Sequence, residues 1–245
     1  MNERYLRLPS RHLGRPAHLW TFGWWGRPVI VFPSASGLAH EWRASGAIAA
    51  LAPLIAAGKI KLYCPESNAS QTWTGEGWGG DRLARHLAYE RFIVEELVPW
   101  IRQDCDSPHI RMGAVGVSLG ALYASNAALR FPELFEHALC LSGRYDAESF
   151  LEGFFDDEAY FHAPYAYVPN LSGYELDRVR RHTSLTLVVG LGPHENTCIP
   201  ETLKMGRLLR EKGIPHYQDV WGHDSAHHWD WWKRQLRLHL AHRYA

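Results

Sequence analysis

The chain has 245 residues, of which 46% are hydrophobic and 21% charged, and 26 Lys and Arg residues balance 26 Asp and Glu residues. This length and composition suit one sizeable core, so we expect a single domain spanning residues 1–245. The balanced charge provides no basic field for nucleic acid, and no apolar run is long enough to cross a bilayer. We therefore expect neither nucleic-acid nor membrane partners, and a cytoplasmic location because the N-terminal segment lacks the apolar centre of a signal peptide.

The four cysteines are scattered along the chain without a CxxC pair. Cys64 and Cys140 lie inside apolar runs that are typical of buried strands. Neither a zinc knuckle nor a disulfide framework is indicated.

The first half of the chain alternates strand and helix patterns. Residues 18–23 and 27–34 are short β-type runs separated by Trp-Trp-Gly, which predicts an antiparallel pair. Residues 47–59 predict a helix that ends at Gly58, and residues 60–65 a strand that stops at a proline. After a loop rich in Trp and Gly, apolar residues at helical spacing predict a long helix over 83–105.

The second half continues the alternation. An apolar run over 109–118 precedes a segment of good helix formers, and two further apolar runs bounded by glycine are typical of strands buried on both faces. The whole pattern predicts an α/β fold with a mostly parallel sheet covered by helices on both faces, and ligands at the carboxyl ends of its strands. An irregular, aromatic-rich insertion at about 146–180 is either a lid or packing over one sheet edge.

The pentapeptide Gly-Val-Ser-Leu-Gly at 116–120 falls between the predicted strand and the predicted helix. A Gly-x-Ser-x-Gly motif in this context predicts a nucleophile elbow, in which small residues let strand and helix approach and expose Ser118. The backbone N–H after the serine then faces an oxyanion. The alternative is a chance pentapeptide in a segment rich in Gly and Ala.

An elbow serine needs an acid and a histidine later in the chain, in that order. After the strand predicted at 185–190 the nearest carboxylate is Glu195, and Glu201 lies further on. The next strand is followed by His223, His227 and His228, and closeness to the strand does not choose among them.

The same C-terminal segment also allows a metal site. His223 and His227 with Asp224 form H-D-x-x-H, one carboxylate away from a zinc-binding H-E-x-x-H motif. We do not favour it, because the segment follows a strand rather than lying in a clear helix and no third ligand is evident.

Several segments in order resemble the putative esterase family of the α/β-hydrolase fold, which is related to esterase D (S-formylglutathione hydrolase), feruloyl and acetyl xylan esterases, enterochelin esterase and antigen 85 mycolyltransferases. The likeness extends over nearly the whole chain. It is carried by the stretches VFPSASG, RHLAYERFIVEELVPWI, GVSLGALYASNAALRFPELF, LSGRYD, YVPNL, KGIPHYQDVWG and HHWDWW.

The resemblance implies roles for particular positions. The nucleophile motif of the family falls on Ser118 and its acid on Glu195, while its C-terminal histidine segment favours His227 over His228. The chain departs from the family at His228, where a carboxylate is common, and at Asp230, where proline is frequent. The implied oxyanion donors are two backbone N–H groups, those of Leu119 and, from the loop at 34–36, Ala35.

The family further implies a serine esterase that cleaves a small-molecule ester without a cofactor. We expect aromatic side chains of the Trp/Gly loop and the insertion to contact the substrate, with loop packing as the alternative: Trp73, Trp78, Phe154, Phe155 and Tyr160. An acyltransferase with the same triad and a non-catalytic binding protein on this fold remain alternative functions. Exposed aromatic residues make a homodimer conceivable.

Overall fold

The computed structural model describes residues 2–245, which are organised around one eight-stranded sheet with the order β1-β2-β4-β3-β5-β6-β7-β8. Strands β3 to β8 run parallel, whereas β1 and β2 are antiparallel to their neighbours. The predicted mostly parallel α/β sheet is confirmed. The strands are β1 (Glu3–Leu8), β2 (Ala17–Phe22), β3 (Arg27–Phe32), β4 (Ile60–Pro65), β5 (Met112–Val117), β6 (Phe135–Leu141), β7 (Leu185–Val189) and β8 (His216–Val220).

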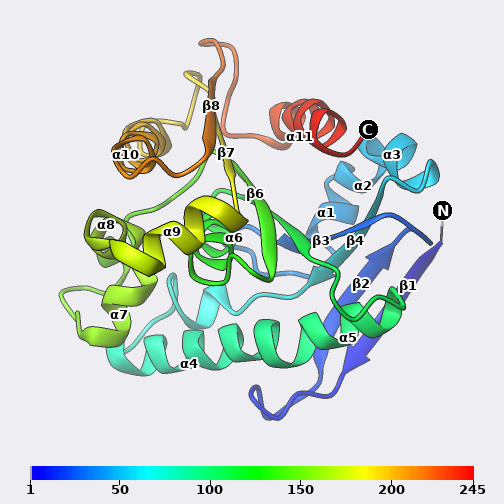
Figure 1. Ribbon diagram of the computed structural model, residues 1–245, viewed down its shortest axis with the longest axis horizontal. Coiled ribbons are helices and arrows are strands. Elements are labelled where there is room, and N and C mark those ends of the chain that lie inside the picture. The colour runs from blue at the N-terminus through cyan, green and yellow to red at the C-terminus, as the bar shows by residue number, and fades with distance from the viewer. Residues whose placement is uncertain (1) are drawn as a thin grey trace.

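Helices cover both faces of the sheet (Figure 1) and bury two apolar clusters against it. One face carries α1 (Glu41–Ala44), α2 (Ala47–Ala50), α3 (Ala52–Ala56) and α11 (Trp229–Tyr244). The other carries α4 (Gly79–Arg91), a π-helical turn (Phe92–Leu97), α5 (Val98–Asp104), α6 (Leu119–Arg130), α9 (Gly173–His182) and α10 (Cys198–Glu211). None of the helices within residues 2–245 is long and apolar enough to cross a membrane.

The predicted antiparallel pairing of 18–23 with 27–34 is wrong. Strand β2 instead pairs with β1, a strand that the sequence pattern did not indicate, and with β4, which lies between β2 and β3. The connection from β2 to β3 therefore crosses the start of β4. A Cβ on Gly26 would lie 2.6 Å from backbone atoms of Lys59 and Ile60, so only glycine permits this crossing.

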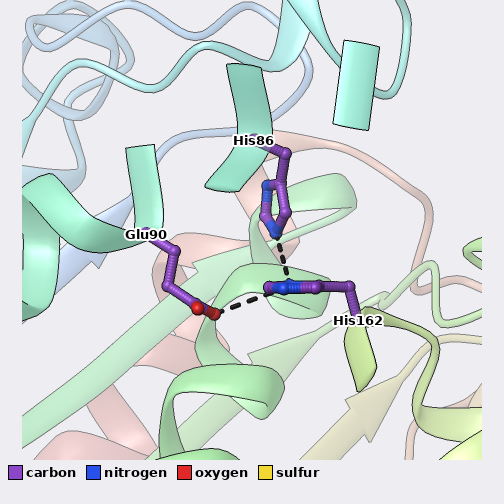
Figure 2. Close-up of side chains that lie close together, drawn as sticks. All are labelled: His86, Glu90 and His162. Atoms are coloured by element: carbon purple, nitrogen blue, oxygen red, sulfur yellow. Dashed lines mark hydrogen bonds and ion pairs between the residues drawn. The ribbon is translucent and has the colours of Figure 1, made fainter. Parts of the chain in front are cut away.

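The insertion is more regular than its sequence suggests. It contains the short helices α7 (Asp157–His162) and α8 (Pro164–Tyr167) before α9, and the Asp156 carboxylate caps α7 by accepting from the Ala159 N–H at 2.8 Å. Figure 2 shows how α7 meets α4: His162 points toward His86, and their Nδ1 and Nε2 atoms are 2.8 Å apart. The insertion is thus anchored to the body of the fold by buried polar contacts.

Candidate active site

Five loops meet at one edge of the sheet because the parallel strands β3, β5, β6, β7 and β8 all end there. Ser118 directly follows β5, and Ser142 directly follows β6. Glu195 lies in the loop after β7, and His227 lies in the loop after β8. This edge gathers the candidate residues that are far apart in sequence.

Ser118 adopts a backbone conformation that is costly for a residue with a side chain, with φ 55° and ψ −121°. The turn is held because strand, helix and neighbouring loop approach very closely. A Cβ on Gly116 would lie 2.1 Å from the Gly120 carbonyl oxygen, and a Cβ on Gly120 would lie 2.4 Å from the Phe32 carbonyl oxygen. Both glycines of the pentapeptide are therefore required sterically, as expected for an elbow.

The Ser118 hydroxyl contacts one histidine, which in turn contacts one carboxylate. Ser118 Oγ lies 3.1 Å from His227 Nε2, and His227 Nδ1 lies 3.4 Å from Glu195 Oε2. Glu195 is fully buried, whereas 20% of the His227 side chain is exposed. The series therefore runs from a half-buried serine hydroxyl through a partly exposed histidine ring to a carboxylate that is shielded from water.

The loop after β7 packs tightly against the loop after β8, and this contact sets the distance between Glu195 and His227. The His227 N–H donates to the Pro193 carbonyl at 3.0 Å. A Cβ on Gly190 would lie 2.0 Å from the Ser225 carbonyl oxygen, and Gly192 is similarly crowded. The glycines that bound the strand pattern at 185–192 therefore also serve the contact between the acid loop and the histidine loop.

The other candidates for the histidine and for the acid make different contacts. His223 is exposed and its Nδ1 faces the Leu191 carbonyl oxygen at 3.3 Å, while His228 caps α11 by accepting from the Asp230 N–H. Glu201 accepts hydrogen bonds from the Arg144 side chain and from backbone N–H groups of the loop after β6. It organises that loop and does not contact the histidine.

Two residues that sequence reasoning missed support the carboxylate. The Ser142 hydroxyl donates to Glu195 Oε1, and the Trp232 indole N–H donates to Ser142 Oγ at 2.9 Å. The Trp232 ring also packs edge-on against His227, with 4.7 Å between the ring centroids. Ser142 immediately follows a strand at the edge of the sheet where ligands are expected, and this position is the feature by which the sequence could have indicated it.

The loop after β3 is held by a carboxylate. The Ser34 N–H donates to Glu41 Oε2 at 2.7 Å, and the Ser34 hydroxyl donates to Glu41 Oε1. Within the described residues, neither the Ala35 N–H nor the Leu119 N–H has a hydrogen-bond acceptor. Both groups expected to form the oxyanion hole are thus uncommitted.

The expected substrate contacts divide into two kinds. Trp73 is only 2% exposed and packs against His86 and Phe150, so the alternative of core packing holds for this residue. Trp78 is 64% exposed and its ring meets Phe154 edge-on at 5.1 Å. Phe155 is exposed and Tyr160 is half-buried. These four side chains remain available for ligand contact.

Two groups of potential metal ligands occur among residues 2–245, and neither includes His223 or Asp224. The first comprises His86, Glu90 and His162 (Figure 2). The Arg130 guanidinium donates to Glu90 and lies 3.0 Å from both His162 ring nitrogens. This group therefore already contains its cation. The second group comprises Glu195, Cys198 and His227.

The strand order, with an elbow after β5, an acid after β7 and a histidine after β8, defines the α/β-hydrolase fold. A family model described as "Putative esterase" matches residues 80–242. The chain belongs to this family and is a carboxylic ester hydrolase acting on small-molecule esters. No protein with a curated description matches the chain significantly in sequence.

Three solved structures are similar over nearly the full chain. A ferulic acid esterase superposes with a TM-score of 0.78 at 16% identity, covering 99% of this chain and 97% of the other. The S-formylglutathione hydrolase of Staphylococcus aureus gives 0.73 at 14% identity, covering 100% and 97%. MPT51 of Mycobacterium tuberculosis gives 0.74 at 17% identity, covering 99% and 97%. At these identities the likeness establishes the fold.

Proposed function

We propose that Ser118, His227 and Glu195 form the catalytic triad of a serine esterase that works through an acyl-enzyme. The observation that carries the proposal is the hydrogen-bonded series from Ser118 Oγ to His227 Nε2 and from His227 Nδ1 to Glu195 Oε2. It starts at a residue with a strained backbone between strand and helix, which is the geometry of a nucleophile elbow.

The reaction follows from this arrangement. His227 Nε2 takes the proton of Ser118 as Oγ attacks the ester carbonyl, and the buried Glu195 stabilises the imidazolium that forms. The imidazolium then protonates the departing alcohol, and a water molecule activated by the same ring hydrolyses the acyl-enzyme. No cofactor enters these steps.

The oxyanion of each tetrahedral intermediate would accept from the backbone N–H groups of Leu119 and Ala35. Support comes from two facts: both groups are uncommitted, and the Glu41 carboxylate fixes the loop on which Ala35 lies. Donors that are held in place before reaction avoid the cost of reorganisation in the transition state.

Aromatic side chains of the Trp/Gly loop and the insertion suggest the substrates to screen. Trp78 and Phe154 form an edge-on pair, and Phe155 lies beside them in sequence. Aromatic faces of this kind suit planar or sugar-bearing groups. Because the structural neighbours include a ferulic acid esterase and an S-formylglutathione hydrolase, feruloyl esters and the thioester S-formylglutathione head the substrate set, with p-nitrophenyl acetate as a general probe.

The triad is tested by replacing its members singly. We expect Ser118→Ala to lower kcat for p-nitrophenyl acetate by about 10⁴-fold or more and to abolish labelling by a fluorophosphonate, without a change in melting temperature. Ser107→Ala, outside the site, is the matched control. Labelling of Ser118→Ala at the wild-type rate would exclude this serine as the nucleophile.

The acid is tested separately. Glu195→Gln should lower kcat by about 10³-fold, because the neutral amide no longer stabilises the imidazolium. Glu211→Gln, on the exposed end of α10, should behave like wild type. If Glu195→Gln retains full activity while Asp219→Asn or Asp224→Asn is inactive, the acid has been assigned to the wrong residue.

A further inference from the structure

The neighbourhood of His227 contains a thiol that the proposed reaction does not use. Cys198 begins α10, is 3% exposed, and its Sγ lies 3.7 Å from His227 Nδ1. Glu195 Oε2 lies 3.4 Å from the same nitrogen. Each of the three residues therefore offers one potential ligand atom: a sulfur, a nitrogen and an oxygen. These three atoms all lie within 4.8 Å of one another.

The sulfur–nitrogen and nitrogen–oxygen separations match those of a tetrahedral zinc site. With a Zn–S distance of about 2.3 Å and Zn–N and Zn–O distances of about 2.1 Å, tetrahedral angles place sulfur and nitrogen about 3.6 Å apart and nitrogen and oxygen about 3.4 Å apart. The observed distances are 3.7 Å and 3.4 Å. The fourth ligand of such a site would be a water molecule.

We propose that Glu195, Cys198 and His227 form an inhibitory binding site for a thiophilic divalent cation such as Zn²⁺, Cd²⁺ or Co²⁺. A thiolate, an imidazole and a carboxylate together select such ions over Mg²⁺ and Ca²⁺, which prefer oxygen ligands. With one thiolate and one carboxylate, the bound divalent ion forms a group without net charge, which suits a buried position.

A metal ion bound at this site would prevent His227 from acting as the base. The Cys198 thiol releases its proton to solvent as sulfur binds the metal. The metal takes the lone pair of His227 Nδ1, so the ring proton moves to Nε2. In that tautomer Nε2 is a donor facing Ser118 Oγ and no longer accepts its proton. The carboxylate is at the same time withdrawn from the ring, because its oxygen binds the metal.

Direct binding is measured with Co²⁺, independently of catalysis. Titration of the wild-type protein should produce a near-ultraviolet thiolate-to-cobalt charge-transfer band and the intense visible bands of tetrahedral Co²⁺, both removed by Zn²⁺ and unaffected by Mg²⁺. Cys198→Ser should lose the thiolate band, and Cys198→Ala repeats the test without the hydroxyl. Cys105→Ser, at a cysteine beside Tyr63, is the matched control and should keep the band. Co²⁺ bound only by surface histidines would give no thiolate band and would overturn the proposal.

Inhibition provides the second readout, and this arm rests on the proposed function. Zn²⁺ should inhibit hydrolysis of p-nitrophenyl acetate by wild type, and Cys198→Ser should raise the concentration for half inhibition by at least about tenfold. An unchanged value in Cys198→Ser would refute the site.

Ser118→Ala separates the two proposals. If this variant binds Co²⁺ with the thiolate band but wild type hydrolyses no ester, the triad fails and the metal site stands. If wild type hydrolyses esters and shows no thiolate band, the metal site fails and the triad stands.

Discussion

Glu41 holds the loop after β3 through both oxygens of its carboxylate. Its two carboxylate oxygens accept from the N–H and the hydroxyl of Ser34, and the Ser36 N–H approaches Ser34 Oγ at 3.3 Å. These contacts surround Ala35 on both sides. Glu41 therefore acts as a positioning residue for the proposed oxyanion donor.

Removal of this carboxylate should slow the chemical step more than it weakens binding. We expect Glu41→Ala to lower kcat for p-nitrophenyl acetate by about tenfold to a hundredfold with little change in KM, because a displaced donor costs less than a deleted one. Arg43→Ala, which removes an exposed side chain of the same helix, should leave kcat unchanged. A rise in KM alone would assign Glu41 to substrate binding instead.

At the residue scale, the sequence predicted Ser118 and Glu195 from their order after successive strands, and the structure brings them together through His227. Among the three histidines, spacing could not choose, because all lie within one loop and only its folding shows which ring faces the serine. Ser142 and Glu41 were missed for a related reason. Their roles depend on contacts between loops that are remote in sequence.

At the scale of elements, the elbow depends on how closely α6 approaches the loop after β3. The Cβ of an alanine at Gly120 would meet the backbone carbonyl oxygens of Phe32 and Pro33 at 2.4 and 2.5 Å. Backbone atoms in a central strand and its loop have little freedom to retreat. The absence of a side chain at Gly120 therefore allows α6 to approach the loop after β3 this closely.

Gly120→Ala should destabilise the protein by about 1–3 kcal/mol, the usual cost of overpacking a core, in urea unfolding experiments. Gly206→Ala is a matched helical control, because its Cβ would meet only the end of the Gln218 side chain, which can rotate away. Alanine is also the better helix former at that position. Equal losses of stability in the two variants would contradict the steric explanation.

The alternation of strands and helices was predictable because buried parallel strands leave continuous apolar runs, as in β5, β6 and β7. The order of the strands at the N-terminal edge of the sheet was not predictable from the sequence. Pairing of β2 with β4 depends on the chain crossing at Gly26, which no local pattern reveals. The helices of the insertion were missed because prolines and aromatic residues obscure their short periodicity.

On the scale of the whole molecule, buried histidines make the fold sensitive to acid. Burial lowers the pKa of His86 from 6.5 to about 3, with a further contribution from Arg130. Burial likewise lowers the pKa of His137 to about 3. At these two histidines the unfolded chain therefore binds more protons than the folded one between pH 6.5 and 3, so they leave stability unchanged well above pH 6.5 and lower it as the pH falls toward 3.

His86→Gln should reduce this sensitivity. Between about pH 7 and pH 5.5 the free energy of unfolding of the variant should fall by roughly 1 kcal/mol less than that of wild type, because one neutral buried ring is gone. Urea titrations at both pH values measure the difference, in which groups such as Glu90 that titrate in both proteins largely cancel. His109→Gln, at an exposed position, should retain the wild-type dependence. The same loss in both variants would rule out His86 as the source.

The position of α11 has a consequence for how the protein is made. Ser118 precedes His227 by 109 residues, and Trp232, Leu236 and Leu240 of α11 complete the apolar cluster on one sheet face. During synthesis on the ribosome, Ser118, the proposed nucleophile, emerges long before His227, its proposed base, and before the helix that closes this face. A nascent chain that stalls before His227 would contain Ser118 without the residue proposed to deprotonate it. Hydrolytic capability would arrive in one late step, together with the final burial of the core.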